Sequence, residues 1–481
     1  MTLEAVRAAV GGGYSASLHR ALPTLRPYQT EVFNAVADSV LHRRGLTFTV
    51  MMARQAGKNE LSAQLELFLL MKHVKLPVDG IKCAPTFAPQ GYVSLRRLRD
   101  RIQQAGFSEI FAQEPGPALR IGMARQLFLS ADDAANVVGH TARLLLEVDE
   151  AQDVSPDKFD REFRPMAAST GATTVYYGTP WDGSTLLARA VETHLELERL
   201  DGIQRHFQAD WTAVAEVNAD YGRYVEAERL RLGDDHPLFR TQYCLKTISG
   251  EGRLFSGSQR AQLQGAHARR HAPAAGETYV AGLDIGGQAF GYEGASRHDA
   301  TVLTIARAVP PAEGALVREP RLEVVEHLAF TGEPHDALFA RIADVLGRVW
   351  RVRRLCVDAT GLGETLARLL SRALGDDVVR PLRFSVESKS RLGYGLLAAV
   401  NGGRAQIYAA DGSSEYRAFW REIEAARVAY RANQAMNFYV APSDGHDDYL
   451  VSLALAVDAA AGLDPRPRVA RGRIQSLSSL N

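Results

Sequence analysis

Cysteine, lysine and long apolar runs are all scarce in this sequence of 481 residues. Its three cysteines, Cys83, Cys244 and Cys356, are too few for a disulfide framework and too widely spaced for a zinc motif. We expect them to be buried packing residues. No apolar run approaches the roughly 18 residues of a membrane helix, and residues 1–15 lack the basic start and apolar stretch of a secretory signal. These absences favour a cytoplasmic protein that is neither secreted nor embedded in a membrane.

The overall charge predicts no particular partner. Acidic and basic residues balance to a formal net charge of zero, so any nucleic-acid contact must come from local patches. The 46% apolar and 23% charged content is that of a folded globular protein. A chain of this length is expected to form two or three domains of roughly 100 to 200 residues each. Only 7 of the 56 basic residues are lysines. A lysine directly after a glycine, as at Lys58, is therefore less expected by chance.

The first half alternates strand-like and helix-like segments, as in a parallel sheet with crossover helices. The strand candidates are continuous apolar runs, which suits strands buried on both faces. They are Leu46 to Met52, Gly80 to Ala84, Leu144 to Val148 and Thr173 to Gly178. We predict one α/β domain over residues 1–248, in which the helical, polar stretch 184–248 forms a small lid.

The second half begins after a Gly-, Ser-, Gln- and Ala-rich stretch, 249–277, which we predict to be a linker. A second α/β domain is predicted over 278–461, followed by a flexible basic tail at 462–481. Its strands are expected at Tyr279 to Ile285, Thr301 to Ala306, Leu322 to Phe330 and Leu355 to Asp358, with helices at His335 to Arg351 and Asp447 to Ala461.

A phosphate-binding loop is indicated at Ala53 to Asn59. Such a loop needs a strand, a turn with inward-facing N–H groups, a lysine, and a helix N-terminus that favours anions. Met52 stands where a first glycine is usual, and Asn59 stands where a Ser or Thr would hold magnesium. Taken alone, the Gly-Lys pair at Lys58 could equally be a surface turn.

An apolar strand that ends in two carboxylates supplies the other half of a nucleotide site. Asp149 is placed to bind a magnesium ion between the β and γ phosphates, and Glu150 to orient the attacking water. A strand that runs into a solvated acidic turn is the alternative for one carboxylate, but it suits an Asp-Glu pair less well. The combination predicts ATP hydrolysis with Mg²⁺.

The sequence resembles the large subunits of bacteriophage terminases. The motifs that carry the resemblance are Leu25-Arg26-Pro27-Tyr28-Gln29, Ala53 to Glu60, Val148 to Gln152 and Tyr177-Gly178-Thr179-Pro180. By position, the resemblance places Gln29 near adenine, Arg54, Gln55, Ala56, Gly57, Lys58 and Asn59 at the phosphates, Asp149 on magnesium, Glu150 as the catalytic carboxylate, and Thr179 in the segment that couples hydrolysis to movement. Arg54 within the subunit and Arg143 reaching into a neighbour are rival charge-stabilising residues, and Arg143 could simply flank a buried strand.

The second half offers acids for a two-metal nuclease. Cleavage of this kind needs several carboxylates around two Mg²⁺ or Mn²⁺ ions about 4 Å apart. Asp284 and Asp358 end predicted strands, and Asp447 and Asp448 open the last helix. Turn residues, a helix cap or a favourable first-turn charge are the respective alternatives. Asp299 and His446 are weaker candidates.

The predicted fold class is therefore α/β: a P-loop (RecA/ASCE-like) ATPase domain with a small helical lid, then an RNase H-like nuclease domain. The resemblance implies ATP-driven translocation of double-stranded viral DNA into a procapsid and metal-dependent cutting of concatemers. It also implies a homo-oligomeric ring, a small terminase subunit and a portal protein as partners, in the host cytoplasm and transiently at the portal. Candidate phosphate contacts are Arg96, Arg97, Arg99 and Arg101, or arginines near Arg391; either group could be a solvated helix face.

Two other functions are compatible with the same motifs. A helicase-nuclease or restriction-type translocase would share both chemistries, but no second RecA-like domain is visible in the sequence. A binding protein with a degenerate ATP site is suggested by Met52 and Asn59.

Overall fold

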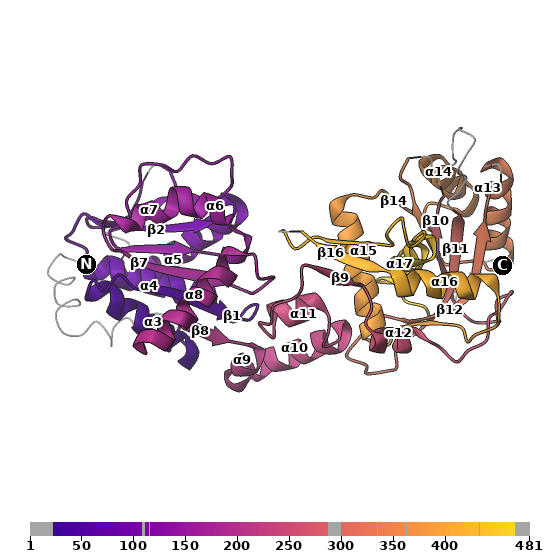
Figure 1. The fold of residues 1–481 in the computed structure, drawn as a ribbon, viewed down its shortest axis with the longest axis horizontal. Coiled ribbons are helices and arrows are strands. Elements are labelled where there is room, and N and C mark those ends of the chain that lie inside the picture. The colour runs from indigo at the N-terminus through magenta and orange to yellow at the C-terminus, as the bar shows by residue number, and fades with distance from the viewer. Residues whose placement is uncertain are drawn as a thin grey trace, which may run out of the picture. The chain divides into compact units, whose positions relative to one another are not determined.

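The computed structural model describes residues 23–107, 111–114, 116–286, 300–333, 335–361, 363–431 and 433–466. Its contacts divide the chain into two units (Figure 1). The first unit extends to Glu226 and includes Pro237–Ser249. The second unit comprises Ala227–His236 and the chain from Gly250 onward.

A mixed sheet forms the centre of the first unit. Within the described residues its strands follow the order β3-β4-β5-β2-β6-β7-β1-β8, and all neighbours from β5 to β8 are parallel. Parallel strands bring their carboxyl ends to one edge, which is where ligands bind in such sheets. The strands are β1 (Thr47–Met52), β2 (Asp79–Ala84), β3 (Phe111–Glu114), β4 (Ala118–Ile121), β5 (Ala124–Ser130), β6 (Leu145–Val148), β7 (Thr173–Gly178) and β8 (His206–Ala209).

Helices cover both faces of this sheet. One layer contains α3, α4 and α5, which contact one another in that order. The opposite face packs its apolar side chains against α8 and the helical segment around Phe159 and Phe163. The helices are α3 (Pro27–Leu41), α4 (Lys58–Lys72), α5 (Tyr92–Gln104), α6 (Pro156–Lys158), α7 (Arg164–Ala168), α8 (Leu186–Asp201), α9 (Trp211–Val217), α10 (Ala219–Leu232) and α11 (Pro237–Gln242), with short turns at Phe87–Gly91, Ala151–Asp153 and Phe159–Phe163.

The second unit has a sheet of order β14-β13-β10-β11-β12-β15 in its described part. Three antiparallel strands, β10 to β12, are followed by β13 and β14, which run parallel to β10. The order of elements along the chain, three strands, a helix and a further strand, is the one predicted for this domain. The strands are β10 (Tyr279–Asp284), β11 (Thr301–Val309), β12 (Arg321–Phe330), β13 (Arg354–Asp358), β14 (Val379–Leu382) and β15 (Ala405–Ile407).

The last helix, α17 (Asp448–Ala460), lies against β10 and β11 and is apolar on nearly every side. Its burial matches its composition, because a helix without a polar face must be covered all round. The remaining elements are α12 (Gly257–Leu263), α13 (His335–Asp344), α14 (Gly363–Leu374), α15 (Val386–Asn401) and α16 (Ser414–Ala425), a turn at Val345–Val349, and a small antiparallel sheet of β9 (Glu251–Arg253), β16 (Arg427–Tyr430) and β17 (Met436–Tyr439).

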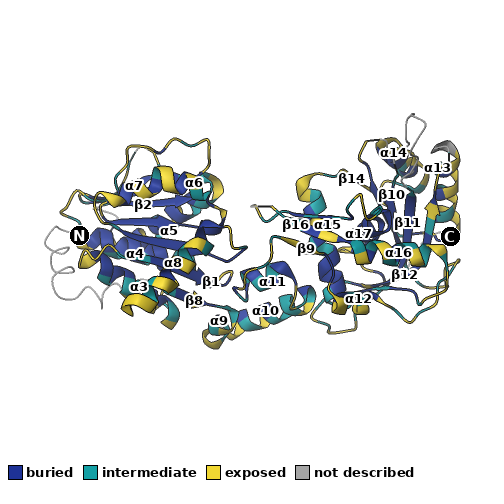
Figure 2. Ribbon diagram, in the orientation of Figure 1, coloured by how far each residue is buried: buried dark blue, intermediate teal, exposed yellow. Residues whose placement is uncertain are grey.

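Burial follows this layering. Figure 2 shows dark blue strands inside both units and yellow exposed residues on the outer helices. Cys83 and Cys356 are buried, as expected, whereas Cys244 is only half-buried. None of the described helices combines the length and apolar composition needed to span a bilayer.

The structure corrects two predicted boundaries. Residues 249–277 are not a simple linker, because β9 pairs with β16 and α12 packs on α15. The stretch 184–248 is only partly a separate lid, because β8 extends the main sheet beside β1 and α8 packs on β1 and β7. In both stretches, polar composition hid short elements that bury only one side. Most of the predicted tail, 467–481, lies outside the described residues.

Gly282 allows β10 to approach α17 closely. A Cβ at this position would lie 2.1 Å from the backbone oxygen of Ser452 and 2.3 Å from the backbone nitrogen of Ala456. Gly282→Ala must therefore push strand and helix apart, and we expect it to lower the free energy of unfolding by about 1–3 kcal/mol. Urea denaturation measures this effect.

Gly395→Ala is the matched control. Gly395 lies within α15 and a Cβ there would meet no atom within 4 Å, so alanine should leave the stability unchanged or raise it by up to about 1 kcal/mol. If Gly282→Ala and the unmodified protein unfold at the same urea concentration, the close approach of β10 to α17 does not contribute to stability as proposed.

Candidate functional sites

The loop between β1 and α4 has the shape of an anion-binding turn. Its backbone turns through left-handed conformations at Gln55 (φ 62°) and Gly57 (φ 98°) before the helix begins at Lys58. Only glycine fits readily at position 57, because a Cβ would lie 2.5 Å from the Nε2 atom of Gln29. A tight turn at a helix N-terminus directs N–H groups towards a bound phosphate. The strand, turn and helix predicted around Ala53 to Asn59 are present, and the contact of this loop with phosphate stays a prediction.

Residues at the start of α3 hold this loop from outside. Gln29 donates from Nε2 to the carbonyl oxygen of Gly57 (3.0 Å), and its Oε1 accepts from the backbone N–H of Arg26 (2.8 Å). The hydroxyl of Tyr28 donates to the carbonyl of Ala56 (2.9 Å). Gln29 therefore lies at the nucleotide loop, and its proposed contact with adenine remains a prediction.

The lysine and the acidic pair meet at the same edge of the sheet. Lys58 Nζ lies 3.1 Å from Glu150 Oε1. Asp149 is buried, and its carboxylate accepts from the hydroxyl of Ser94 (3.3 Å) and from the backbone N–H of Glu150 (3.1 Å). The two motifs are 92 residues apart in sequence, and they meet because β1 and β6 run parallel in one sheet. The roles of Lys58, Asp149 and Glu150 in nucleotide binding and hydrolysis stay predictions.

Glu150 is held in its charged form. Burial opposes ionisation, but the charge of Lys58 and a hydrogen bond from Gln152 outweigh it, so the pKa of Glu150 is lowered. Its backbone is left-handed (φ 47°), a strained conformation for a residue with a side chain. Such strain is often found where a side chain must point in one functional direction.

Gln152 connects Glu150 to the end of β7. Its Nε2 donates to Glu150 Oε2 (2.8 Å), and its Oε1 accepts from the backbone N–H of Thr179 (3.2 Å). A Cβ at position 178 would lie 2.2 Å from Gln152 Oε1. Glycine at this position therefore leaves room for the side chain of Gln152. The family resemblance predicts Thr179 in a coupling segment but gives no role to Gln152, although Gln152 lies in the Val148 to Gln152 motif.

The two candidate arginines have different positions. Arg54 is exposed in the loop, donates to Gln242 Oε1 (2.8 Å) and contributes to the lowered pKa of Glu150. Arg143 is exposed before the start of β6. It lies six residues before Asp149, about 20 Å along an extended strand, so it is remote from the site of its own subunit. A role in a neighbouring subunit stays a prediction, as does a role for Asn59.

Four aspartates converge in the second unit. Leu283 of β10 is in register with Val357 of β13, so Asp284 and Asp358 follow at equivalent positions on adjacent parallel strands. Asp284, Asp358 and Asp448 are all buried. Burial, followed by the charges of Asp448, Asp358 and Asp447, raises the pKa of Asp284 well above its usual value. Burial likewise raises the pKa of Asp358. Repulsion of this kind is expected where carboxylates gather to hold cations.

The contacts of these aspartates bear on their alternative roles as turn residues, as a helix cap or as a first-turn charge. Asp447 stands at the N-cap of α17, but its side chain makes no capping hydrogen bond. Asp448 accepts from the backbone N–H of Ala300 (3.1 Å), and Asp358 accepts from that of Thr360 (2.9 Å). His446 is half-buried in the loop before the helix, and Asp299 lies outside the described residues.

Glu422 of α16 is an additional acid that the sequence analysis missed. Its Oε2 accepts from the backbone N–H groups of Tyr449 (2.7 Å) and Leu450 (3.0 Å), so it caps α17 in place of Asp447. Burial, together with the charges of Asp448 and Asp447, raises the pKa of Glu422 to about 9. It is one of several acids on an amphipathic helix, and only the fold distinguishes it.

The donor set suits hard divalent cations. Carboxylate oxygens are the ligands that magnesium and manganese prefer, and the buried acids repel one another without a cation. Among the described residues, however, no three His, Cys, Asp or Glu side chains already surround a common point in metal-binding geometry. Binding of an ion would therefore require these side chains to adjust.

Comparisons with known proteins identify structures of the same fold. No family model and no curated protein matches the chain. The structure of a large terminase from a thermophilic bacteriophage (crystal form 2) is 11% identical, with a TM-score of 0.54, and the match covers 91% of this chain and 99% of that chain. The same terminase in complex with ADP (crystal form 3) is 12% identical, with a TM-score of 0.51, over 90% of this chain and 99% of that chain. The likeness confirms the predicted fold class: the chain has the two-domain α/β fold of these large terminase structures, with a P-loop-type fold followed by an RNase H-like fold.

Proposed function

We propose that this chain is a large terminase subunit that translocates double-stranded DNA with ATP and cuts it with a metal-dependent nuclease. The observation that carries the proposal is that one chain brings together two separate sets of candidate site residues. Lys58 pairs with Glu150 at the ligand-binding edge of the first sheet, and Asp284 gathers with other buried acids on the second. The thermophilic phage terminase, whose fold is similar over 99% of its length, also has a structure with ADP.

In the first unit, the loop and Lys58 would bind the ATP phosphates and Asp149 would hold magnesium. Magnesium, when bound, neutralises charge on the β and γ phosphates. The ionised Glu150 would orient the attacking water, and Arg54 lies close enough to stabilise developing negative charge. Gln152 would transmit the state of Glu150 to Thr179 and the end of β7.

In the second unit, Asp284, Asp358 and Asp448 would hold two Mg²⁺ or Mn²⁺ ions, with Asp447 as a further ligand. Two such ions stabilise the attacking and leaving oxygens of phosphodiester cleavage. Glu422 would keep the N-terminus of α17 in place and thereby position Asp447 and Asp448. The charges of Asp448, Asp358, Asp447 and Glu422 all add to burial in raising the pKa of Asp284.

The partners and setting extend the same proposal. A large terminase would act as a homo-oligomeric ring in the host cytoplasm, bound to a small terminase subunit and transiently to the portal of a procapsid. We also propose the domain limits 1–248 for the motor, 249–277 for the connection, 278–461 for the nuclease and 462–481 for the tail. The stretch 249–277 contains β9 and α12 and is therefore a structured connection. A packaging assay with empty procapsids, in which DNA becomes resistant to nuclease only with ATP, separates a terminase from other DNA motors.

Metal removal provides a direct test of the nuclease. Plasmid DNA should be cut by the purified protein with Mg²⁺ or Mn²⁺, and EDTA should abolish cutting because the carboxylates alone supply neither an activated water nor stabilisation of the leaving oxygen. Addition of excess Mn²⁺ after EDTA should restore it, as followed by agarose gel. Undiminished cutting in EDTA would rule out the two-metal chemistry.

A further inference from the structure

A cleft between α12 and α16 in the second unit has no role in the function proposed so far. Its volume is about 780 Å³, within the usual range for ligand sites. One wall is formed by Arg260 and Gln264, and the other by the face of α16. The α16 residues in its lining include Tyr416, Arg417, Trp420 and Arg421.

The cleft is rich in guanidinium groups. Arg260, Arg417 and Arg421 line it, against a single carboxylate, Glu424. Arg260 and Arg417 donate to the backbone carbonyls of Phe255 (3.2 Å) and Gly412 (2.6 Å). Among the residues that the structure describes, none of the three arginines forms an ion pair with a carboxylate. They therefore keep their charge available for an anionic ligand.

The arginines that were predicted from sequence to contact DNA differ from the cleft arginines, because several of them have carboxylate partners. Arg97 and Arg101 of α5 both pair with Glu60 (3.2 Å each), and Arg101 is buried. Arg391 lies 3.6 Å from Asp458. Carboxylate partners thus offset the positive charges of Arg97, Arg101 and Arg391, which favours the α12–α16 cleft over these three arginines for phosphate contact.

Aromatic rings complete the cleft. Trp420 and Tyr416 lie edge to face with ring centroids 6.2 Å apart. The indole Nε1 of Trp420 is buried and has no hydrogen-bond acceptor among the described residues. A buried donor without an acceptor is costly and uncommon. Tyr416 and Trp420 are half-buried and line the cleft, and arginines beside aromatic rings form the typical surface for an unpaired nucleic-acid strand.

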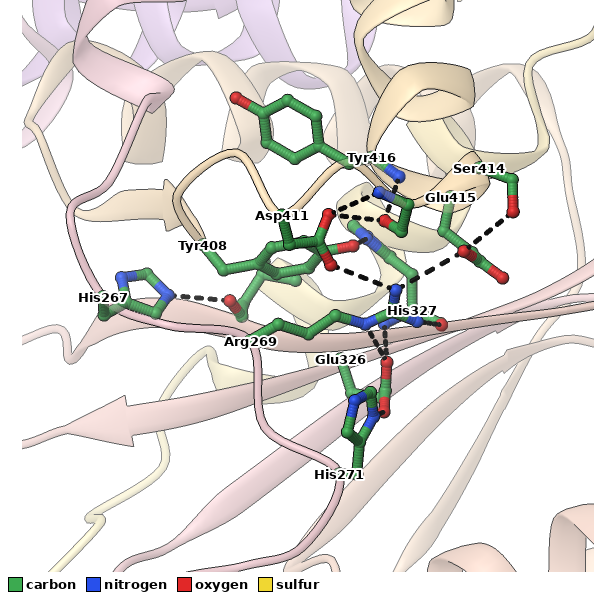
Figure 3. Close-up of polar contacts among 12 residues, drawn as sticks. His267, Arg269, His271, Glu326, His327, Tyr408, Asp411, Ser414, Glu415 and Tyr416 are labelled. Atoms are coloured by element: carbon green, nitrogen blue, oxygen red, sulfur yellow. Dashed lines mark hydrogen bonds and ion pairs between the residues drawn. The ribbon is translucent and has the colours of Figure 1, made fainter.

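A network around Arg269 fixes the start of α16 and thus the shape of the cleft. Figure 3 shows this arginine between β12 and the loop before the helix. Arg269 donates to Glu326 (2.6 Å), Asp411 (3.3 Å) and Glu415 (3.4 Å), and lies over the ring of Tyr408 at 5.4 Å. Because three carboxylates from separate segments share one guanidinium, the arginine-bearing face of α16 is held in place before any ligand binds.

We propose that the α12–α16 cleft binds an unpaired stretch of DNA strand, with phosphates on the arginines and a base against Trp420. The proposal rests on the nuclease function assigned to the second unit, since Glu422 of the same helix belongs to the acid cluster. In a duplex the bases are paired and stacked inside, so only an unpaired strand can offer a base and phosphates together. A strand held here would be retained beside the cutting site.

Binding of a labelled thymidine oligonucleotide to the full chain in EDTA tests the proposal by fluorescence anisotropy. Trp420→Ala should weaken binding about tenfold, as expected for loss of one stacked base. The double variant Arg417→Glu/Arg421→Glu should weaken it further and reduce the slope of log affinity against log salt by about 1.4. Trp420→Phe should retain most of the affinity because it keeps a stacking ring, which excludes a general loss of structure.

A double variant on α14, Arg368→Glu/Arg372→Glu, is the matched control. These arginines are exposed, have the same spacing and lie in the same unit, but not in the cleft, so affinity should be unchanged. A duplex of the same length should bind the Trp420→Ala variant as well as the unmodified protein.

Three results would overturn the proposal: normal oligonucleotide affinity in both cleft variants, equal losses for oligonucleotide and duplex in Trp420→Ala, or displacement of the oligonucleotide only by an acidic peptide. Failure of the nuclease assignment would look different, since Asp284→Asn would then still cut DNA whatever the cleft binds.

Discussion

Replacement of Glu150 by glutamine should lower the rate of ATP hydrolysis roughly a hundredfold or more, while ATP still binds. The glutamine keeps the shape of the side chain and a group that can face Gln152, but it loses the charge. In the unmodified protein, Lys58 and Gln152 lower the pKa of Glu150, so the carboxylate is ionised at neutral pH and can accept a hydrogen bond from water. Phosphate release measures hydrolysis, and a fluorescent ATP analogue measures binding.

Lys58→Ala should behave differently, because it removes a phosphate contact and should weaken nucleotide binding itself. Asp157→Asn is the matched control for loss of one negative charge, since Asp157 is exposed beyond the site and its replacement should leave hydrolysis unchanged. Hydrolysis at the normal rate in Glu150→Gln would refute the catalytic role of Glu150. Absence of hydrolysis in the unmodified protein would favour a binding protein with a degenerate ATP site.

The strands that position these residues could be predicted from sequence because they are buried on both faces. The run from Thr173 to Gly178 forms β7 as predicted, and β1, β2 and β6 differ from their predicted limits by one residue at the start. Continuous apolar runs leave few alternatives for such strands. The same holds for β10 to β13, whose limits differ by a few residues.

Short edge strands were not predictable in this way. β8 buries only alternate residues over four positions, and β9 is exposed at all three of its positions. Neither has a local signal that separates it from a loop, since each is defined by its partner strand. This is why 249–277 resembles a linker in sequence although β9 pairs with β16.

The candidate sites show a similar division. Lys58, Asp149 and Glu150 lie in contiguous motifs whose local order already specifies a strand followed by a turn. The position of Glu422 depends on how α16 packs against α17, and the contact of Gln152 with Thr179 depends on the order of β6 and β7. Such tertiary contacts leave no spacing pattern in one sequence.

Asp284→Asn should abolish metal-dependent plasmid cutting without loss of stability. This combination distinguishes a metal ligand from a residue that is needed for folding. Asparagine has the same size but no charge, so it is a poor ligand for Mg²⁺ or Mn²⁺. It also removes one buried carboxylate from a group in which four other acids raise the pKa of Asp284. The melting temperature in EDTA should therefore equal or exceed that of the unmodified protein, whereas an essential structural residue would melt lower.

Cutting and ATP hydrolysis should be measured on the same preparation. ATP hydrolysis should persist in Asp284→Asn, because Lys58 and Glu150 belong to the other unit. Asp376→Asn, which changes an exposed aspartate of the second unit, should alter neither activity nor melting. Since Asp358 ends β13 as Asp284 ends the adjacent strand β10, Asp358→Asn should give the same loss of cutting. Normal cutting by both site variants would mean that the buried acids do not hold the catalytic metals, and the nuclease would have to be sought elsewhere in the chain.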